Sequence, residues 1–209
     1  MATMALAISY LPALYASYGQ RESRLLTLDD PSGERIQPTA LILIWAPGGD
    51  VERLYRFFGE WEHWTADILE SHVSFPMLAQ FRSQHEGQSW ITALGVVLDA
   101  AALTRAVVPG ADQWEPYFMY RRGRRALQEI SMRLPQSNPP EAPMERWQFD
   151  CAYERVSTIG LPVRDPEEAW KRLTEYRSTY GQTLQALINY LLAPAGFWGH
   201  SAEDAPDDR

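Results

Sequence analysis

The stretch VERLYRFFGEWEHWTADILESH, residues 51–72, decides the fold that the sequence predicts. Its apolar residues recur at spacings of three and four, which places them on one face of an α-helix. Asp50 stands just before it, where a carboxylate can accept hydrogen bonds from the first free backbone amides. The residues on the predicted face are Val51, Leu54, Tyr55, Phe58, Trp61, Thr65, Ile68, Leu69 and His72. We therefore expect a long helix with one buried stripe.

Helical signals continue on both sides of this stretch. Residues 39–45 form a short apolar helix or strand, and Ser74 and Pro76 open a further helix that Gly87 ends. Other helices are expected over residues 89–108, 115–134 and 147–159, and a single helix over residues 165–191. No alternating run is long enough for a sheet, so the sequence predicts an all-α bundle of five or six helices.

The N-terminal run MATMALAISYLPALYASY, Met1–Tyr18, contains no charged residue. As a helix it would span about 27 Å, close to the thickness of a hydrocarbon core. No positively charged region precedes it, so a secretory signal peptide fits poorly. Its serines, tyrosines and proline make it only moderately hydrophobic, which a membrane helix packed on neighbours tolerates. We expect a membrane-type helix here, with an amphipathic helix of a soluble protein as the alternative.

A second membrane-length run extends from Trp90 to Val108. Asp99 and Arg105 interrupt it, and ionisable side chains are expensive in lipid. A helix that is apolar all round is also what the centre of a bundle requires. We therefore expect this segment to be a buried helix of the bundle.

Charge and cysteine content exclude several classes of protein. The 209 residues include 19 basic and 27 acidic ones, which gives a net charge of −8 and argues against a nucleic-acid partner. Four of the acids lie in residues 201–209, which we expect to be a disordered acidic tail. Cys151 is the only cysteine, which excludes an internal disulfide, and we expect it to be a small buried residue.

Residues that could bind a metal do not have the required spacing. Helical di-iron sites need Glu-x-x-His on each of two inward-facing helices, and the one copy here, Glu60–His63, lies off the apolar face. A mononuclear site built from His72 and His85 is the alternative. We favour histidines that are hydrogen-bonded inside the bundle to Asp99, to glutamines or to backbone. No metal, cofactor or enzyme activity is expected, since a nucleophile elbow and a phosphate-binding loop are also missing.

The one basic block of the chain consists of Arg121, Arg122, Arg124 and Arg125. Clustered arginines can bind anionic lipid headgroups when a domain lies beneath a bilayer. Arginines on a helix more often pair with nearby acids and stay solvated. Both interpretations are kept, with the second preferred.

Four stretches resemble the cytosolic C-terminal half of bacterial two-transmembrane potassium channel family proteins. The most distinctive is WEHWTADILESHVSFPMLAQFRSQHEGQSWITALGVVLDAAAL, residues 61–103. AISYLPALYASYGQRES (7–23) is similar to the end of the inner helix of that family, and LLTLDDPSGERIQPTAL (25–41) to the linker that follows. WKRLTEYRSTYGQTLQALINYLLAPAGFW (170–198) resembles the last helix. Together the stretches cover somewhat more than half of the chain.

The resemblance implies an organisation into four parts. Residues 1–20 would be an inner-helix remnant, 21–50 a linker, 51–200 a cytosolic helical bundle and 201–209 the tail. The selectivity motif Thr-x-Gly-Tyr-Gly is absent and no helix precedes Met1, so this polypeptide is not expected to form a potassium-selective pore by itself. The implied location is the cell inner membrane, with most of the chain in the cytoplasm.

The expected function is a non-catalytic assembly or gating role in a potassium-channel-like membrane protein, as a homo-oligomer or channel subunit. The membrane would be bound through Met1–Tyr18. Gating would need a polar switch inside the bundle, for which the candidates are His72, Arg82, His85 and Asp99, and the histidines would make it pH-sensitive. The alternatives are a stand-alone soluble helical protein that binds a ligand or metal, and a hydrolase-like enzyme for which we find no nucleophile and base.

Overall fold

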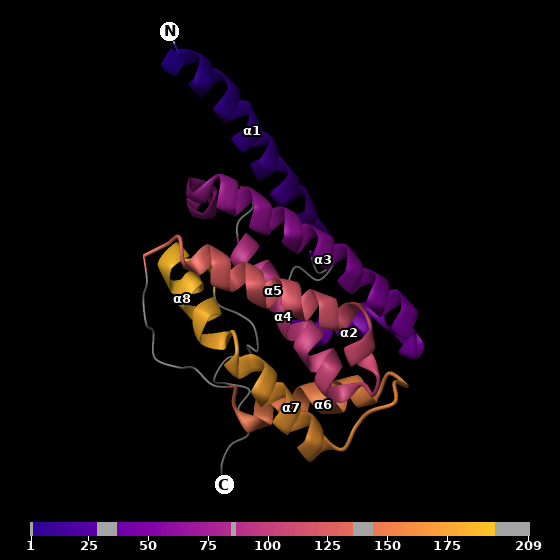
Figure 1. Ribbon diagram of the computed structural model, residues 1–209. Helices are drawn as coiled ribbons and strands as arrows, with labels where there is room; N and C mark the ends of the chain where they lie inside the picture. Colours follow the sequence, from indigo (N-terminus) through magenta and orange to yellow (C-terminus); the bar gives the residue numbers. More distant parts are fainter. Residues whose placement is uncertain (1, 29–36, 85–86, 136–143, 195–209) are drawn as a thin grey trace.

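The computed structural model describes residues 2–28, 37–84, 87–135 and 144–194, with side chains from Tyr10 onward. Within these ranges the regular elements are all helical, which confirms the predicted all-α multi-helix bundle (Figure 1). The α-helices are α1 (Ala2–Leu25), α2 (Pro38–Trp45), α3 (Val51–Ser74), α4 (Trp90–Val107), α5 (Glu115–Ser131), α6 (Arg146–Ser157), α7 (Pro166–Ser178) and α8 (Gly181–Leu191). Short 3-10 helices are η1 (Leu26–Leu28), η2 (Pro47–Gly49), η3 (Pro76–Gln80) and η4 (Ala111–Gln113).

Helix α3 forms as its sequence predicts. The Asp50 carboxylate caps it by accepting from the backbone N–H of Arg53 at 3.1 Å. Phe57 and Trp64 are buried in addition to the predicted stripe. The first stacks on Trp45 of α2 with ring centroids 4.9 Å apart, and the second donates its indole N–H to α1. Helix α3 is therefore covered on more than one side, which a single stripe does not reveal.

Helix α4 is the centre of the bundle, with α5, α7, α2 and α8 packed around it. In the part of the chain that the structure describes, it is the one helix long and apolar enough to cross a membrane. However, 94% of that stretch is buried inside the bundle. The expectation of a buried bundle helix is confirmed. Asp99 and Arg105 on α4 are accommodated because each finds charged partners inside the protein.

Two predicted helices are broken. Within the described part of the expected helix from Ser74 to Gly87, only the five-residue η3 is helical after α3 ends, and residues 81–84 are irregular. Carbonyl groups of this segment accept hydrogen bonds from a side chain of α1 instead. The expected single helix over residues 165–191 is two helices, α7 and α8. Between them Tyr180 has φ −143° and ψ −19°, outside the helical region. This turn brings the Tyr180 hydroxyl to Asp99 of α4.

The N-terminal region is more continuous with the bundle than the predicted divisions suggest. Helix α1 does not end at residue 20 but runs to Leu25, which is buried in the main core. Helix α2 lies within the segment 21–50, forms as a helix rather than a strand, and buries Leu41 and Ile42 completely. The predicted tail, residues 201–209, lies outside the described residues.

Candidate functional site: the junction of α1 with the bundle

The C-terminal part of helix α1 lies beside α3, and its N-terminal half projects beyond the bundle (Figure 1). Its C-terminal half packs on α3 and η3. Leu14 and Tyr18 are buried against Leu78, and the ring of Tyr10 meets that of Phe75 edge-on, with centroids 5.1 Å apart. One face of α1 therefore belongs to the protein interior.

A buried arginine fixes the base of α1. Arg21 is 2% exposed, and its guanidinium donates to the carbonyl oxygens of Leu78 at 3.0 Å and Phe81 at 2.7 Å. The Nε–H group donates to the Glu22 carboxylate at 2.9 Å, which also balances the charge. A planar guanidinium with several donors in fixed directions suits such a divided contact, whereas an ammonium group does not.

Two more side chains bind the same irregular segment. The Tyr18 hydroxyl donates to the carbonyl oxygen of Arg82 at 2.9 Å. On α4, the indole N–H of Trp90 donates to the carbonyl oxygen of Ala79 at 3.2 Å. With the two Arg21 contacts, four carbonyl groups between residues 78 and 82 are held by side chains of α1 and α4. We call Tyr18, Arg21, Glu22, Trp90 and residues 78–82 the junction.

His72 of α3 is buried next to the junction. It is 1% exposed, and its ring centroid lies 4.5 Å from that of Trp90. Its Nδ1 is 2.8 Å from the carbonyl oxygen of Ile68. A carbonyl only accepts, so Nδ1 carries the proton and Nε2 is the bare nitrogen, without a hydrogen bond to the described residues. Burial, and next the positive charge of Arg21, lower the pKa of His72 to about 3, so the ring is neutral at physiological pH.

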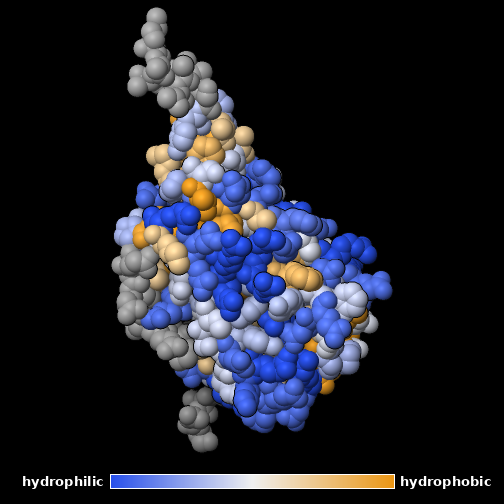
Figure 2. All heavy atoms as spheres, in the orientation of Figure 1, coloured by the Kyte–Doolittle hydropathy of each residue, from blue (hydrophilic) through white to orange (hydrophobic). Residues whose placement is uncertain are grey.

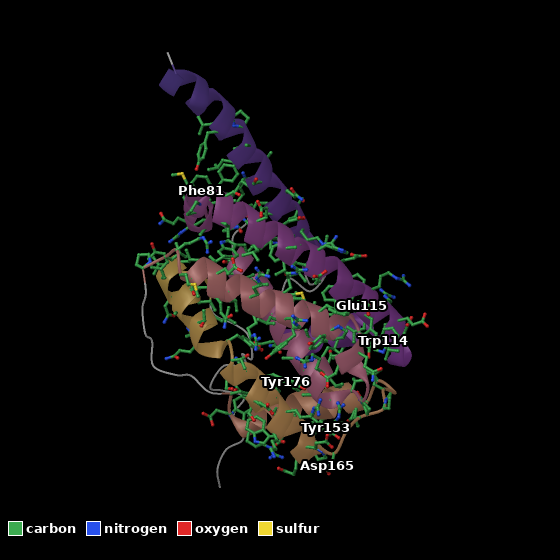
Figure 3. All side chains as sticks on the ribbon, viewed as in Figure 1. Phe81, Trp114, Glu115, Tyr153, Asp165 and Tyr176 are labelled. Atoms are coloured by element: carbon green, nitrogen blue, oxygen red, sulfur yellow. The ribbon has the colours of Figure 1, made fainter. Side chains whose placement is uncertain are left out.

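Large apolar side chains stay exposed around the place where α1 leaves the bundle. On α1, Leu11 is 63% and Tyr15 69% exposed. Figure 2 shows hydrophobic residues along α1 and where it meets the bundle, whereas hydrophilic residues cover most of the visible bundle. Figure 3 places Phe81 at this end of the molecule. We call this surface the collar, and its residues are Tyr10, Leu11, Tyr15, Met77 and Phe81.

A cleft of about 260 Å³ opens beside the collar. Residues 79–83, 87–90 and 191–194 line it, so the irregular segment after η3, the start of α4 and the end of α8 form its walls. The hydrogen bond from the Thr92 hydroxyl to the carbonyl oxygen of Pro194, 2.9 Å long, ties two of these walls together.

The residues predicted to form a polar switch do not lie together. Asp99, fully buried, accepts from Arg177 at 3.0 Å and from the Tyr180 hydroxyl at 2.5 Å. It stands nine residues, or about 13 Å along α4, from Trp90, whose ring lies 4.5 Å from that of His72. Arg82 is exposed, and only its backbone carbonyl takes part in the junction. His85 lies outside the described residues.

We call Asp99, Arg177 and Tyr180 the Asp99 cluster, and Arg105 with two further tyrosines lies near it. Burial, and next the charge of Asp99, hold the pKa of Tyr180 well above its ordinary value, so the phenol remains a donor. Nearby, the guanidinium carbon of Arg105 lies 4.3 Å from the ring centroid of Tyr120 and 4.1 Å from that of Tyr176. These contacts join α4 to α5, α7 and α8, and their place is the core rather than an accessible site.

The basic block is partly paired with acids on the bundle surface. Arg122 donates to Glu62 of α3 at 2.8 Å, and Arg125 donates to Glu129 of α5 at 2.6 Å. The other two arginines lie over tyrosine rings of their own helix, at 5.5 and 5.8 Å from the centroids. This is the arrangement expected for solvated arginines, and contact with anionic lipid remains a prediction.

Two further sequence expectations concern metals and cysteine. No group of three His, Cys, Asp or Glu side chains that could hold a metal occurs among the residues described. The expectation that Cys151 is buried is wrong, since it is exposed on α6. The helical period alone does not say which side of this short helix faces the core, and Phe149, Ala152 and Val156 occupy the buried side.

Sequence reasoning missed the residues that build the junction. Arg21 and Glu22 are the first charged residues after the uncharged N-terminal run, which is the one signal that distinguishes them. Arg21 is buried because residues 78–82 turn their carbonyl groups toward it. The sequence predicted a regular helix over these residues, in which those carbonyl groups would bond within the helix. Comparison with protein-family models, with curated proteins and with solved structures finds no match to this chain.

Proposed function

We propose that this chain is a non-catalytic helical domain that attaches to a membrane through α1 and serves in the assembly or gating of a potassium-channel-like membrane protein. The observation that carries the proposal is α1 itself. The helix projects from the bundle, exposes Leu11 and Tyr15, and contains no charge before Arg21. A surface of this kind in water favours association with an apolar partner.

The junction supports the gating part of the proposal. A gating domain transmits movement only if the membrane helix is fastened to it, because otherwise the helix moves alone. Arg21 and Tyr18 fasten α1 to the segment 78–82, and Trp90 connects the same segment to the central helix α4. A tilt of α1 would therefore pull on carbonyl groups that are also bonded to the core.

The channel part of the proposal rests on the resemblance of residues 7–23, 25–41, 61–103 and 170–198 to the channel family. The proposed location is the inner membrane, with the bundle in the cytoplasm. An oligomer follows from the assembly role, because subunits of such channels surround one central pore.

Membrane attachment is tested by fractionation of cells that express the chain. We expect the wild-type chain in the membrane fraction, and the variant Leu11→Lys/Tyr15→Lys in the soluble fraction, because both substitutions charge the exposed face of α1 and leave its packed face intact. Leu26→Lys is the matched control, since this residue is exposed at the base of α1 and should remain compatible with the membrane. A soluble wild-type chain, or a membrane-bound double variant, would contradict the attachment.

Light scattering of the detergent-extracted chain should give an oligomer, and a monomer would contradict the assembly role.

The cleft supports a second candidate, a helical protein that binds a small ligand. At about 260 Å³ it lies just below the usual range of ligand sites, about 300–1,000 Å³. This candidate predicts that the wild-type chain is soluble and copurifies with a small molecule visible by native mass spectrometry. A metal would be detected by elemental analysis of the same sample.

A further inference from the structure

We propose that the collar lies in the interfacial layer of a bilayer with zwitterionic headgroups, so that the bundle itself touches the membrane through η3. This inference rests on the proposed membrane attachment and adds the depth, the contact surface and the lipid class. It places the membrane boundary inside the predicted segment Met1–Tyr18, at Tyr10 to Tyr15.

The residues that form the collar belong to two stretches without charged side chains. Residues 1–20 contain no charged side chain, and neither do residues 75–81, although the chain has 46 basic and acidic residues in total, the sum of 19 and 27. These two uncharged stretches meet at the collar through the Tyr10–Phe75 and Tyr18–Phe81 ring contacts. An uncharged surface on a chain of net charge −8 fits an interface without net charge. None of the five collar residues is basic, and the exposed Arg82 directly after Phe81 is the basic side chain next to them in sequence.

The projecting part of α1 favours a bilayer over another copy of this chain as the partner of the collar. A second copy would cover one side of α1. Seven of the nine residues in the sequence MATMALAIS (1–9) are Met, Ala, Leu or Ile, and none is charged. The first turns of α1, from Ala2, project beyond the bundle, and a bilayer would cover a helix of this composition on every side.

The spacing of residues along α1 matches the layers of a bilayer. Tyrosine prefers the membrane interface, where its ring is in an apolar layer and its hydroxyl is hydrated. From Tyr10 to Tyr15 the helix rises about 7.5 Å, comparable to the interfacial layer of roughly 5–7 Å on each side of a bilayer. The first charged residue, Arg21, lies about 9 Å farther along α1 than Tyr15, on the side away from the membrane. Its charge is balanced by Glu22. No charged side chain of residues 1–20 has to enter the membrane in this orientation, because these residues have none.

Co-sedimentation of the purified full chain with phosphatidylcholine vesicles tests the inference. Met77→Ser/Phe81→Ser removes apolar surface from the bundle side of the collar and leaves α1 unchanged. We expect its vesicle partitioning to be about tenfold weaker than that of the wild type, because partial burial of two large side chains is lost. The matched control is Trp114→Ser/Phe118→Ser, two exposed residues at the start of α5, which should bind like the wild type. Figure 3 places Trp114 at the opposite end of the molecule from Phe81.

The possible results separate this inference from the proposed function. Wild-type protein that binds no vesicles overturns both. Wild-type and Met77→Ser/Phe81→Ser proteins that bind equally overturn the collar contact and leave the α1 attachment standing. Binding that requires added phosphatidylserine overturns the zwitterionic assignment. A lipid-free dimer that dissociates in the collar variant shows that a second copy covers this surface, which also overturns the inference.

A labelling experiment covers the case in which the serine variant does not fold. Cys151 is the only cysteine, so a Cys151→Ser background allows one environment-sensitive dye to be attached at Phe81→Cys or at Trp114→Cys. We expect a blue shift of the emission on addition of phosphatidylcholine vesicles for the dye at residue 81 alone. An unchanged spectrum at residue 81 with vesicle-bound protein would overturn the collar contact.

Discussion

Two buried charge clusters in this molecule are built in different ways. At the junction, Arg21 binds backbone carbonyls of an irregular segment near the end of the bundle. In the core, Asp99 binds the side chains of Arg177 on α7 and of Tyr180 in the turn between α7 and α8. Each cluster neutralises one buried charge, but only the second lies where several helices meet.

The two clusters therefore stabilise different parts of the molecule. Loss of the Asp99 cluster leaves buried polar groups in the centre, so the whole bundle is affected. Loss of the Arg21 contacts releases a short segment and the base of α1, while the packing of α3, α4 and α5 is retained. We therefore infer that the Asp99 cluster specifies the fold and that the junction couples α1 to it.

The largest expected effect comes from Asp99→Ala. It leaves the Arg177 guanidinium and the buried Tyr180 hydroxyl without this acceptor, and removing one partner of a buried pair destabilises by about 3–5 kcal/mol. Urea unfolding followed by tryptophan fluorescence at pH 7 measures it. Asp99→Asn keeps the shape and one acceptor oxygen, and should destabilise less. A loss below about 1 kcal/mol for the alanine variant would show that the cluster does not hold the core together.

Arg21→Met should have a smaller and more local effect. It removes two charge-assisted contacts to carbonyl groups and leaves Glu22 half of a buried pair near the surface, for a loss of about 2–3 kcal/mol. Hydrogen exchange should speed up in residues 76–84 and stay unchanged in α4. Arg24→Met is the control one turn later, since its pair with Glu60 is exposed and contributes less than about 1 kcal/mol. Faster exchange throughout α4 would contradict the distinction between the two clusters.

The smallest expected effect concerns pH and His72. Its pKa is about 3 in the folded protein and about 6.5 when unfolded, so the unfolded state binds one more proton between these values. Folding stability therefore falls as pH drops below 6.5, by roughly 2 kcal/mol at pH 5 from this group alone. Urea unfolding at pH 7 and at pH 5 should show that His72→Gln loses less folding stability between these two pH values than the wild type does.

His63→Gln, on the exposed side of α3, controls for the removal of a histidine. An identical pH dependence in the wild type and His72→Gln would remove His72 from the predicted polar switch. The same experiment on His85→Gln tests the other histidine of that prediction.

Much of the fold could be predicted because long helices carry a strong periodic signal. The α3 stripe and its Asp50 cap, and the burial of α4, follow from spacing and from the residues that interrupt the run. The breaks at η3 and at Tyr180 could not be predicted. Each forms because a distant side chain binds the local backbone or because a local side chain reaches a distant partner, and neither leaves a mark in the local sequence.

The candidate site was predicted only in outline. The uncharged run before Arg21 indicated a distinctive N-terminal helix. His72 was expected to bond to Asp99, to glutamines or to backbone, and of these the structure shows a contact with the backbone carbonyl of Ile68. The proposed grouping of His72 with Asp99 is not seen, because helical period places residues on a face but does not give their height against a neighbouring helix.

The sequence by itself determined that this protein is helical, where its longest helices lie and that its first twenty residues carry no charge. These properties depend on the types and spacing of residues close in the chain. Only the tertiary structure decided that Arg21 is buried, that residues 78–82 serve as acceptors and that apolar side chains from α1 and η3 share one surface. Those facts depend on which distant segments meet, and the energy of a buried charge or an exposed apolar patch is defined only when they have met.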